Sequence, residues 1–421
     1  MDRSIPVYVY CGDVNYFKTH NYCGQGWGGF TNFVGMDCEY DLSIEGHDGA
    51  TGGWNLIASP LVSDVAPADV GNMLNDVYDL YRFDGSQETK EWRNFKNSAN
   101  NGFTMLSFGQ GYLYANSNNV TLQFVGPKSI ADSYTVDLTS SSAKLGKWNL
   151  IGNSSTDAAT VSVSDYYRIE DSDRSVIVLS SGQVNAMEGI FVEYSGTQTE
   201  VTFTKANRGA RAFGSPMVNI DLRDAEGRLL DRARLRTGEG ASMGKLDILS
   251  DPNRLYFRLD DEDYAMVRVN GEGEMPLNFD AAQDGSFTLS VKVEGMDMGY
   301  LHLVDNMTGA DVDLLATSTG SEATYTFIAK TTDYASRFRL VFDTNNASVG
   351  STSFAYISNG NIVVTNASAN AMLQIVDVMG RVIVSVGGHT RCITTSGIPA
   401  GVYVLRLVSG DDVKVQKIII G

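Results

Sequence analysis

The feature that most constrains this chain is its almost complete lack of helical periodicity. Short runs instead alternate between apolar and polar side chains, and each is bounded by glycine, asparagine or aspartate. Such alternation is typical of strands with one buried face, and turns at short intervals favour β-sandwiches. The clearest runs are Val120–Phe124, Tyr256–Leu259, Met266–Val269, Phe287–Val293, Tyr325–Ile328 and Phe338–Phe342. We therefore predict an all-β protein of tandem β-sandwich domains, immunoglobulin-like or jelly-roll-like in kind.

One segment departs from this pattern. Its apolar residues have the spacing of one helix face: Val70, Met73, Leu74 and Val77. Pro67 stands where a first helical residue is favoured. The spacing predicts a helix over Pro67–Tyr78.

Charge and hydropathy exclude two kinds of interaction. The chain has 421 residues, 32 of them basic and 50 acidic, which gives a formal charge of −18. No cluster of lysine and arginine could neutralise a phosphate backbone, so we expect no nucleic-acid partner. No apolar stretch approaches the roughly 18 residues of a membrane helix, so we expect no transmembrane segment.

Two regions of the chain contain the same short motifs in the same order. The related segments are Gly53–Ile57 and Lys147–Ile151, Tyr81–Phe83 and Tyr167–Ile169, Gly109–Tyr114 and Met187–Val192, and Thr121–Phe124 and Glu200–Phe203. This order indicates an internal repeat, whose copies form either two small domains or two halves of one sandwich. In both cases we expect Trp54 and Trp148 to be equivalent core residues.

Repeats and composition divide the chain into five regions. Residues 1–44 form the tail of an upstream module, 45–127 and 128–206 the two tryptophan-containing repeats, 207–346 a further β-sandwich, and 347–421 a small last domain. Small polar residues mark Ala347–Ser353 as a linker. Seven arginines lie between Arg208 and Arg236, interleaved with acids, and we interpret them as solvated strand faces and turns.

One pentapeptide has the form of a nucleophile elbow. Gly240-Ala241-Ser242-Met243-Gly244 matches G-x-S-x-G, a motif that needs a strand before it and a helix after it. The following residues run into Pro252 too soon to form that helix. A glycine-rich hairpin loop is therefore favoured over a serine hydrolase that uses Ser242, and we expect no catalytic residues.

Metal and cofactor signals are weak. The four acids Asp260–Asp263 lie between two predicted strands, and clustered carboxylates can bind calcium. The run lacks the D-x-D-x-D-G spacing of a calcium loop, so a solvated hairpin tip is favoured. Four histidines are spread over the chain, and we expect no metal site or cofactor beyond this calcium alternative.

Cysteine spacing leaves the redox state open. Cys11, Cys23 and Cys38 lie close together, whereas Cys392 is distant, and no C-x-x-C pair suggests zinc. A disulfide among the first three and buried free thiols are both compatible with this arrangement.

Aromatic residues of the first repeat provide the one binding signal. Several asparagines lie near the aromatic residues Tyr78, Tyr81, Trp92, Tyr112 and Tyr114, and aromatic faces beside amides suit sugar rings. Core packing is the alternative for such residues. The hypothesis assigns glycan binding to Trp92, Tyr112 and Tyr114, with a polysaccharide or a host-surface ligand as the partner.

The end of the chain carries an ordered set of motifs. Leu373–Val382 is followed by Pro399-Ala400-Gly401-Val402-Tyr403 and then by Lys414–Ile418. Over residues 354–421 this order resembles the type A C-terminal sorting domain of type IX secretion cargo. The resemblance implies a seven-stranded sandwich that directs export through the type IX machinery and is removed by a sortase-like peptidase. It carries the sorting signal over to Pro399, Ala400, Gly401, Tyr403, Lys414 and Lys417. Gln416 and Lys417 interrupt the alternation and predict a bulge or a fraying edge.

Other segments resemble modules that accompany such domains. Gly299–Leu315 is similar to a recurrent segment of these secreted proteins, as is Tyr78–Phe83 followed by Gly109–Tyr114. Ile5–Gly12 and Trp27–Asn32 resemble the tail that follows repeat arrays in bacterial surface antigens. Met1–Pro6 does not have the pattern of a signal peptide. Type IX cargo requires one, so we expect a chain that lacks its front.

Two functions follow as hypotheses. The favoured one is the non-catalytic C-terminal region of a secreted or surface-anchored bacterial protein, which acts as an adhesin, stalk or binding module. The alternative is the accessory region of a secreted protease or glycoside hydrolase whose catalytic domain lies upstream.

Overall fold

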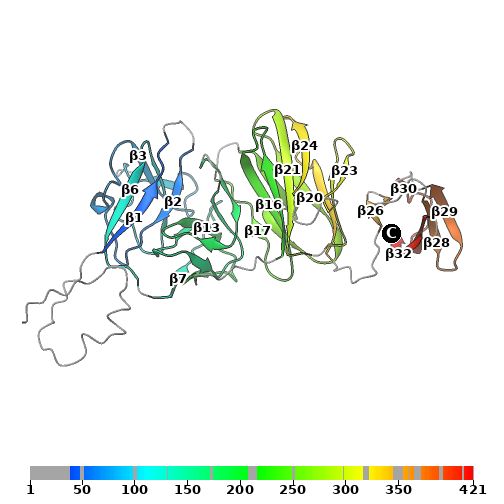
Figure 1. The fold of residues 1–421 in the computed structure, drawn as a ribbon, viewed down its shortest axis with the longest axis horizontal. Helices are drawn as coiled ribbons and strands as arrows, with labels where there is room; N and C mark the ends of the chain where they lie inside the picture. Colours follow the sequence, from blue (N-terminus) through cyan, green and yellow to red (C-terminus); the bar gives the residue numbers. More distant parts are fainter. Residues whose placement is uncertain are drawn as a thin grey trace, which may run out of the picture. The chain divides into compact units, whose positions relative to one another are not determined.

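Figure 1 shows the computed structural model, whose described part is almost entirely β-structure, as the sequence predicts. The structure describes residues 38–47, 52–97, 102–129, 131–170, 174–206, 216–248, 252–296, 298–315, 322–344, 354–358, 360–364, 371–387, 392–409 and 412–420. The predicted linker Ala347–Ser353, the segments Ile5–Gly12 and Trp27–Asn32, and the cysteines Cys11 and Cys23 lie outside these residues. So does the side chain of Cys38.

The chain divides into two compact units. The first contains Met1–Arg268, Pro276–Gly295 and Thr317–Phe338, and the second contains Val269–Met275, Met296–Ala316 and Arg339–Gly421. The two predicted repeats lie in the first unit, and the C-terminal domain lies in the second.

The first predicted repeat has two sheets around a core of its own, and Cys38–Ile44 of the predicted upstream tail joins it as a strand. Its strands are β1 (Cys38–Ile44), β2 (Asn55–Ala58), β3 (Tyr78–Phe83), β4 (Trp92–Asn94), β5 (Gly111–Asn116) and β6 (Val120–Gly126). β1 pairs with β6, and the other four have the order β2-β5-β3-β4. Alternate residues of both sheets, including Leu80, Tyr112 and Leu122, form one buried cluster.

The helix predicted over Pro67–Tyr78 is wrong. Only the 3-10 turn η1 (Pro67–Asp69) forms, and β3 begins at Tyr78. Asn72 and Asp76 have φ angles of 63° and 60°, a left-handed backbone that ends helical structure. Val70 and Met73 are nevertheless buried in the core cluster. The helical spacing therefore reflects residues that reach the core from consecutive turns.

The second predicted repeat forms two four-stranded sheets. Its strands are β7 (Ser133–Asp137), β8 (Trp148–Gly152), β9 (Ala159–Val161), β10 (Tyr166–Ile169), β11 (Ile177–Ser180), β12 (Gln183–Val184), β13 (Gly189–Glu193) and β14 (Glu200–Lys205). The orders are β11-β10-β13-β8 and β12-β9-β14-β7. Tyr166, Ile190 and Phe203 contribute to the core between them.

The two regions also share a third core. In the second repeat, Leu150 on β8 and Phe191 on β13 point away from the core of that repeat. In the first repeat, Leu56 on β2 and Phe83 on β3 likewise point away from the core of the first repeat. All four lie in one buried cluster with Met243, Leu246, Ala265 and Met266. The sheets β2-β5-β3-β4 and β11-β10-β13-β8 therefore each have buried apolar residues on both sides.

A larger antiparallel sheet follows, and most of its strands lie in the first unit. Its strands are β15 (Met217–Arg223), β16 (Leu229–Thr237), β18 (Arg254–Leu259), β19 (Glu262–Val269), β20 (Glu272–Asp280), β21 (Gly285–Glu294) and β24 (Ala323–Ala329), in the order β20-β18-β19-β16-β15-β21-β24. The short β17 (Met243–Gly244) also pairs with β19. In the second unit, β22 (Tyr300–Asp305) pairs with β23 (Asp311–Asp313), and β25 (Phe338–Asp343) lies beside β22.

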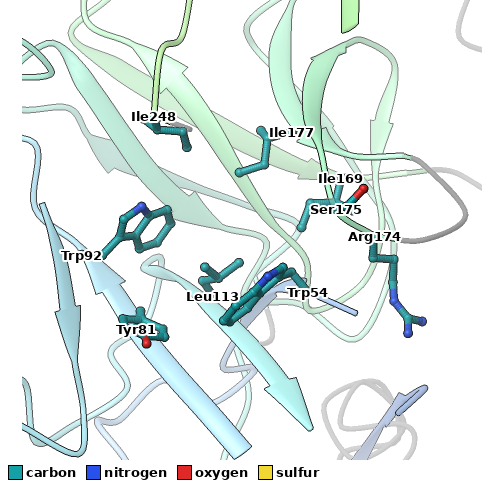
Figure 2. A pocket seen from close by; sticks show the side chains of 9 residues that line it. All are labelled: Trp54, Tyr81, Trp92, Leu113, Ile169, Arg174, Ser175, Ile177 and Ile248. Carbon is teal, nitrogen blue, oxygen red and sulfur yellow. The ribbon is translucent and has the colours of Figure 1, made fainter. Parts of the chain in front are cut away.

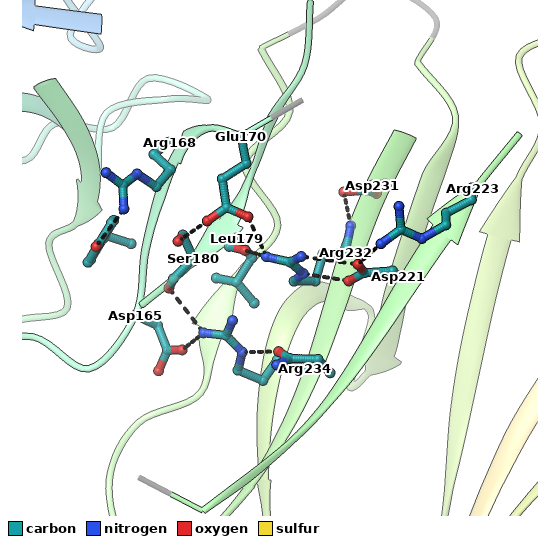
Figure 3. Close-up of polar contacts among 12 residues, drawn as sticks. Asp165, Arg168, Glu170, Leu179, Ser180, Asp221, Arg223, Asp231, Arg232 and Arg234 are labelled. Atoms are coloured by element: carbon teal, nitrogen blue, oxygen red, sulfur yellow. Dashed lines mark hydrogen bonds and ion pairs between the residues drawn. The ribbon is translucent and has the colours of Figure 1, made fainter. Parts of the chain in front are cut away.

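The interpretation of the arginines as solvated is wrong for the C-terminal half of β16. Arg234 and Arg236 are each 2% exposed, and Arg232 is also largely covered. Figure 3 shows the side chains of Arg232 and Arg234 beside acids of the second repeat. Arg232 binds Glu170 at 2.7 Å, and Arg234 and Arg236 both bind Asp165.

The side chains of Arg232 and Arg234 also donate hydrogen bonds to the edge strand of a sheet. β11 is the last strand of its sheet, and the carbonyl oxygens of Leu179 and Ser180 accept hydrogen bonds from Arg232 and Arg234, each at 3.0 Å. An unpaired strand edge is costly to bury. The guanidinium groups therefore allow β11 to lie against β16.

The described residues of the C-terminal domain form seven strands in two sheets, as the resemblance to a sorting domain implies. They are β26 (Ala355–Ser358), β27 (Asn361–Val364), β28 (Met372–Asp377), β29 (Val382–Gly387), β30 (Cys392–Thr394), β31 (Gly401–Ser409) and β32 (Asp412–Ile420). Their orders are β26-β27-β30 and β29-β28-β31-β32. Buried side chains of both sheets, such as Ile362, Leu405 and Ile418, form its core.

The irregularity predicted at Gln416 and Lys417 is wrong. β31 and β32 pair without a register shift from Gly401↔Ile420 to Ser409↔Asp412. Gln416 faces inward, where its Oε1 accepts hydrogen bonds from the backbone N–H groups of Phe354 and Ala355 at 2.7 and 2.9 Å. A polar residue interrupts the apolar pattern there because its side chain accepts hydrogen bonds from the backbone N–H groups at the start of β26.

Candidate functional site

The first unit contains an aromatic pocket of about 330 Å³. It is lined by Trp54, Tyr81, Trp92, Leu113, Ile169, Arg174, Ser175, Ile177 and Ile248. Figure 2 shows two tryptophans and four aliphatic side chains gathered around the same space. Its volume falls within the range of small-molecule sites. We refer to it as the aromatic pocket.

Strand register brings the aromatic side chains to one face. Tyr81 on β3 lies between Leu113 of β5 and Asn94 of β4, and Trp92 lies opposite Phe83 on the same pair of strands. Trp54 comes just before β2. Gly53 has a φ of 71°, a conformation that favours glycine, and the N–H of Trp54 donates to the carbonyl oxygen of Arg174 at 3.0 Å.

The three rings contact each other edge to face. Trp54 and Tyr81 have centroids 6.0 Å apart at 65°, and Tyr81 and Trp92 have centroids 6.4 Å apart at 80°. This geometry is a favourable one for aromatic pairs. It fixes the ring orientations before any ligand binds, so the pocket is preorganised.

The charge at the pocket is balanced. The guanidinium of Arg174 binds the Glu45 carboxylate at 2.9 Å and the Glu45 carbonyl oxygen at 2.8 Å. In Figure 2 this guanidinium points away from the two tryptophans. Burial, with a smaller contribution from Asp79, raises the pKa of Tyr81, so its hydroxyl stays neutral. These features suit an uncharged ligand with an apolar surface.

A similar aromatic pair in the second repeat is closed. Trp148 and Tyr167 meet at 5.4 Å and 87°, and both are buried. Met243 and Leu246 pack against them, and the N–H of Leu246 donates to the Tyr167 hydroxyl at 3.1 Å. Trp148 is thus a core residue, as predicted. The matching expectation for Trp54 is wrong, because Trp54 is only partly buried and lines the pocket.

Of the three residues predicted to bind a glycan, one lines the pocket and two are buried in the core. Trp92 lies in the aromatic pocket, but Tyr112 and Tyr114 are 1% and 0% exposed and cannot stack against a sugar. The Tyr114 hydroxyl donates to the carbonyl oxygen of Met73 at 2.7 Å, and Tyr112 accepts from the N–H of Ser107 at 2.8 Å. Their assignment to a binding surface is therefore wrong.

Sequence reasoning missed Trp54 as a pocket residue, and it did not separate Tyr81 from the other tyrosines of the first repeat. Alternation along β3 places Leu80 in the core of the first repeat and Tyr81 on the opposite face. The alternation of Leu80 and Tyr81 can be read from the sequence, but it does not show whether the face that bears Tyr81 is covered by other residues. Only the neighbouring sheet decides this.

The surroundings of Ser242 are not those of a nucleophile elbow. The residues that follow form β17, which pairs with β19, rather than a helix. The hydroxyl oxygen of Ser242 accepts a long hydrogen bond from the N–H of Arg268 at 3.4 Å. His302 lies in the second unit, with its Nδ1 2.7 Å from Asp311.

The acidic run is the tip of a hairpin, as favoured from the sequence. Asp260 and Asp261 join β18 to β19 with φ angles of 47° and 65°, as in a type I′ turn. Asp263 binds Arg254 at 2.9 Å and Arg258 at 2.6 Å. Across the described residues, no group of three or more acids, histidines and cysteines is arranged to hold a metal ion.

The predicted sorting-signal residues lie around the β31–β32 hairpin. The Tyr403 hydroxyl donates to the carbonyl oxygen of Pro399 at 2.8 Å, so the buried ring fixes the entry into β31. Pro399 and Ala400 are exposed, and Gly401 begins the strand. Lys414 and Lys417 lie on opposite faces of β32, because they are three positions apart and successive side chains of a strand alternate between its faces.

Comparison with known proteins identifies the C-terminal domain. Residues 358–421 match the family model described as the secretion system C-terminal sorting domain. No curated protein matches the sequence. Over the residues that the structure describes, no helix has the length and apolar character needed to cross a membrane. The resemblance of the front segments to surface-antigen modules stays a prediction.

Proposed function

Because the chain ends in a type IX secretion C-terminal sorting domain, which indicates a secreted or cell-surface protein, we propose that its first unit is a non-catalytic binding module for a neutral sugar ring. The observation that carries this proposal is the aromatic pocket. Its rings offer apolar faces, and no charged group in its lining is without a counter-ion. The role would be that of an adhesin or a binding module on the exported protein.

Hydrogen-bond donors support a sugar over a purely apolar ligand. Among the described residues, the indole N–H groups of Trp54 and Trp92 have no hydrogen-bond partner. A pyranose ring has an apolar C–H face and hydroxyl oxygens that can accept such bonds. An apolar ligand of the same size would leave both donors unsatisfied when it excluded water.

The matching strand orders support a duplication as the origin of the pocket. The order β2-β5-β3-β4 corresponds to β8-β13-β10-β11, and the shared motifs fall on corresponding strands. In the second copy, Met243, Leu246 and residues of β19 cover the Trp148–Tyr167 pair. We propose that the first copy left its equivalent pair open for a ligand.

Binding to a panel of immobilised neutral and acidic polysaccharides tests the proposal, followed by calorimetry with the best one. Trp54→Ala and Trp92→Ala should each weaken binding about tenfold, since a lost aromatic contact of about 1.5 kcal/mol corresponds to that factor. Tyr334→Ala removes an exposed ring outside the pocket and should leave affinity unchanged. Unchanged binding by the double tryptophan variant would overturn the pocket assignment.

The same module would also suit the alternative role, as the accessory region of an upstream hydrolase. The sequence upstream of residue 1 in the genome distinguishes these roles. Labelling of Ser242 by a reactive serine probe would contradict the non-catalytic assignment.

A further inference from the structure

The C-terminal domain exposes an apolar sheet face. We define the outer face as the side of the sheet β29-β28-β31-β32 that points away from the domain's core. Leu405, Leu407 and Ile418 occupy the inner side. Val415 and Ile419 on the outer face are 55% and 64% exposed, and Met372, Val402 and Val413 are also exposed.

Strand register makes these side chains one continuous patch. Val402 lies opposite Ile419, and Val413 lies opposite Val408, which in turn lies opposite Met372. Directly opposed residues on one face are in contact range. Scattered apolar residues are normal on a surface, whereas a contiguous patch marks an interaction site.

Two cations lie within this patch. Arg406 is opposite Val415, and Lys417 is the next residue of β32 on the same face, opposite Val404. The remaining outward positions of β28 are Gln374 and Val376, so the described outward residues of β28, β31 and β32 include no carboxylate. Residues 354–421 carry a net charge of +2, whereas the whole chain carries −18.

We propose that the outer face is the surface by which the secretion machinery holds this domain, and that the partner surface is apolar and bears carboxylates opposite Arg406 and Lys417. This rests on the sorting role of residues 358–421, because a domain read by a secretion system must present a surface to it. The inner side cannot serve, since it forms the domain's core.

Charge complementarity favours such a partner over a second copy of this domain. Two outer faces packed together would bring Arg406 and Lys417 near the same residues of the other copy, and like charges at an interface are costly. An apolar surface that bears carboxylates would contact the apolar residues of the outer face and pair with its two cations. The apolar contact would supply affinity, and the charges would fix orientation.

Export of the full chain tests the inference. The chain, supplied with a cleavable signal peptide, is expressed in a bacterium with type IX secretion and in an isogenic strain without it. Val415→Ser/Ile419→Ser reduces the apolar area, and Arg406→Glu/Lys417→Glu reverses the charge. Val378→Ser/Met379→Ser is the matched control, because these residues are 77% and 78% exposed at the β28–β29 turn, away from the outer face.

We expect both outer-face variants to accumulate in the periplasm, with the exported fraction reduced about tenfold or more, as for a loss of about 1.4 kcal/mol in binding. The turn variant should be exported like the wild type. Purified proteins should share one melting temperature, which excludes misfolding as the cause.

Several results would overturn the inference. Normal export of the folded Val415→Ser/Ile419→Ser variant would show that the outer face is not held, and normal export of the charge-reversed variant would contradict an acidic partner. Equal retention of the turn variant would show that the position of the apolar residues does not matter. Binding of the wild type to anionic phospholipid vesicles, lost in both outer-face variants, would assign the face to lipid instead. Failure of the wild-type chain itself to be exported would refute the sorting role.

Discussion

Arg236 donates two hydrogen bonds to Asp165, from Nε to Oδ2 at 2.8 Å and from Nη2 to Oδ1 at 2.9 Å, and both side chains are 2% exposed. Arg234 binds the same carboxylate. Asp165 directly precedes β10, whereas both arginines lie on β16. A single buried carboxylate therefore ties the second predicted repeat to the sheet that follows it.

Removal of this carboxylate should strongly destabilise the first unit. Asp165→Ala leaves two buried guanidinium groups without their counter-ion, and breaking a buried ion pair in this way costs about 3–5 kcal/mol. Urea unfolding followed by tryptophan fluorescence measures the free energy of unfolding. Asp64→Ala, at an exposed position outside this network, is the control and should change it little. A loss below about 1 kcal/mol for Asp165→Ala would mean that the network relaxes around the gap.

Acid should weaken the same contact. Burial opposes ionisation of Asp165, but Arg234 and Arg236 outweigh burial and lower the pKa of its carboxyl. A carboxyl whose pKa is lower in the folded than in the unfolded state contributes stability above the unfolded-state pKa, and this is lost as the pH falls through the folded-state pKa. The free energy of unfolding should therefore decrease as the solution is acidified below the ordinary aspartate range. Asp165→Asn should show a shallower decrease, and parallel curves would contradict this assignment.

Tyr114→Phe should test the buried role of that tyrosine. The hydroxyl donates to Met73 and accepts from the side-chain amide of Asn116 at 3.0 Å, and the residue is fully buried. Loss of the hydroxyl removes a donor to the Met73 carbonyl oxygen and one of the two acceptors of the Asn116 amide, which also donates to the Asn75 carbonyl oxygen. The loss of these buried hydrogen bonds costs about 1–3 kcal/mol. Chemical denaturation measures the change, with Tyr334→Phe as the exposed control. Glycan binding should be unaffected, because Tyr114 does not line the pocket.

Gln416→Leu should loosen the start of β26. The backbone N–H groups of Phe354 and Ala355 lose their acceptor, so their hydrogen exchange should accelerate about fivefold or more, as for a loss of about 1 kcal/mol. Mass spectrometry of the full chain can measure this exchange. Gln374→Leu, on the outer face of the same sheet, is the control. Equal protection in wild type and Gln416→Leu would show that the side chain does not hold this strand.

A chain that ends at Asn346 should keep the first unit folded but lose export. The core of the C-terminal domain is formed by residues between Phe354 and Ile420. Thermal unfolding of the first unit should therefore be unchanged, while the truncated protein stays in the periplasm. Surface display of that protein would contradict the sorting role.

Local patterns predicted much of this fold. The runs Val120–Phe124 and Phe287–Val293 fall within β6 and β21, because alternation of side chains along a strand is set by near neighbours in the chain. The seven strands of the C-terminal domain follow instead from the resemblance to a sorting domain, which rests on the order of its motifs. The helix over Pro67–Tyr78 failed because three or four well-spaced apolar residues can also reach a core through successive turns.

The candidate site was only partly predictable. Trp92 was identified, but Tyr112 and Tyr114 belong to the core, and Trp54 replaces them in the pocket. A strand pattern shows that a side chain points to one face or the other. It contains no information on what covers that face.

The sequence by itself determined the all-β class, the strand positions and the C-terminal sorting domain, because these depend on alternation and motif order within short segments. Only the tertiary structure decided which charged and aromatic residues are covered. Arg234 became buried and Trp54 partly open through contacts with residues far away in the chain, Asp165 and Ile248 among them. Burial is a property of the packed neighbours, and no local pattern specifies them.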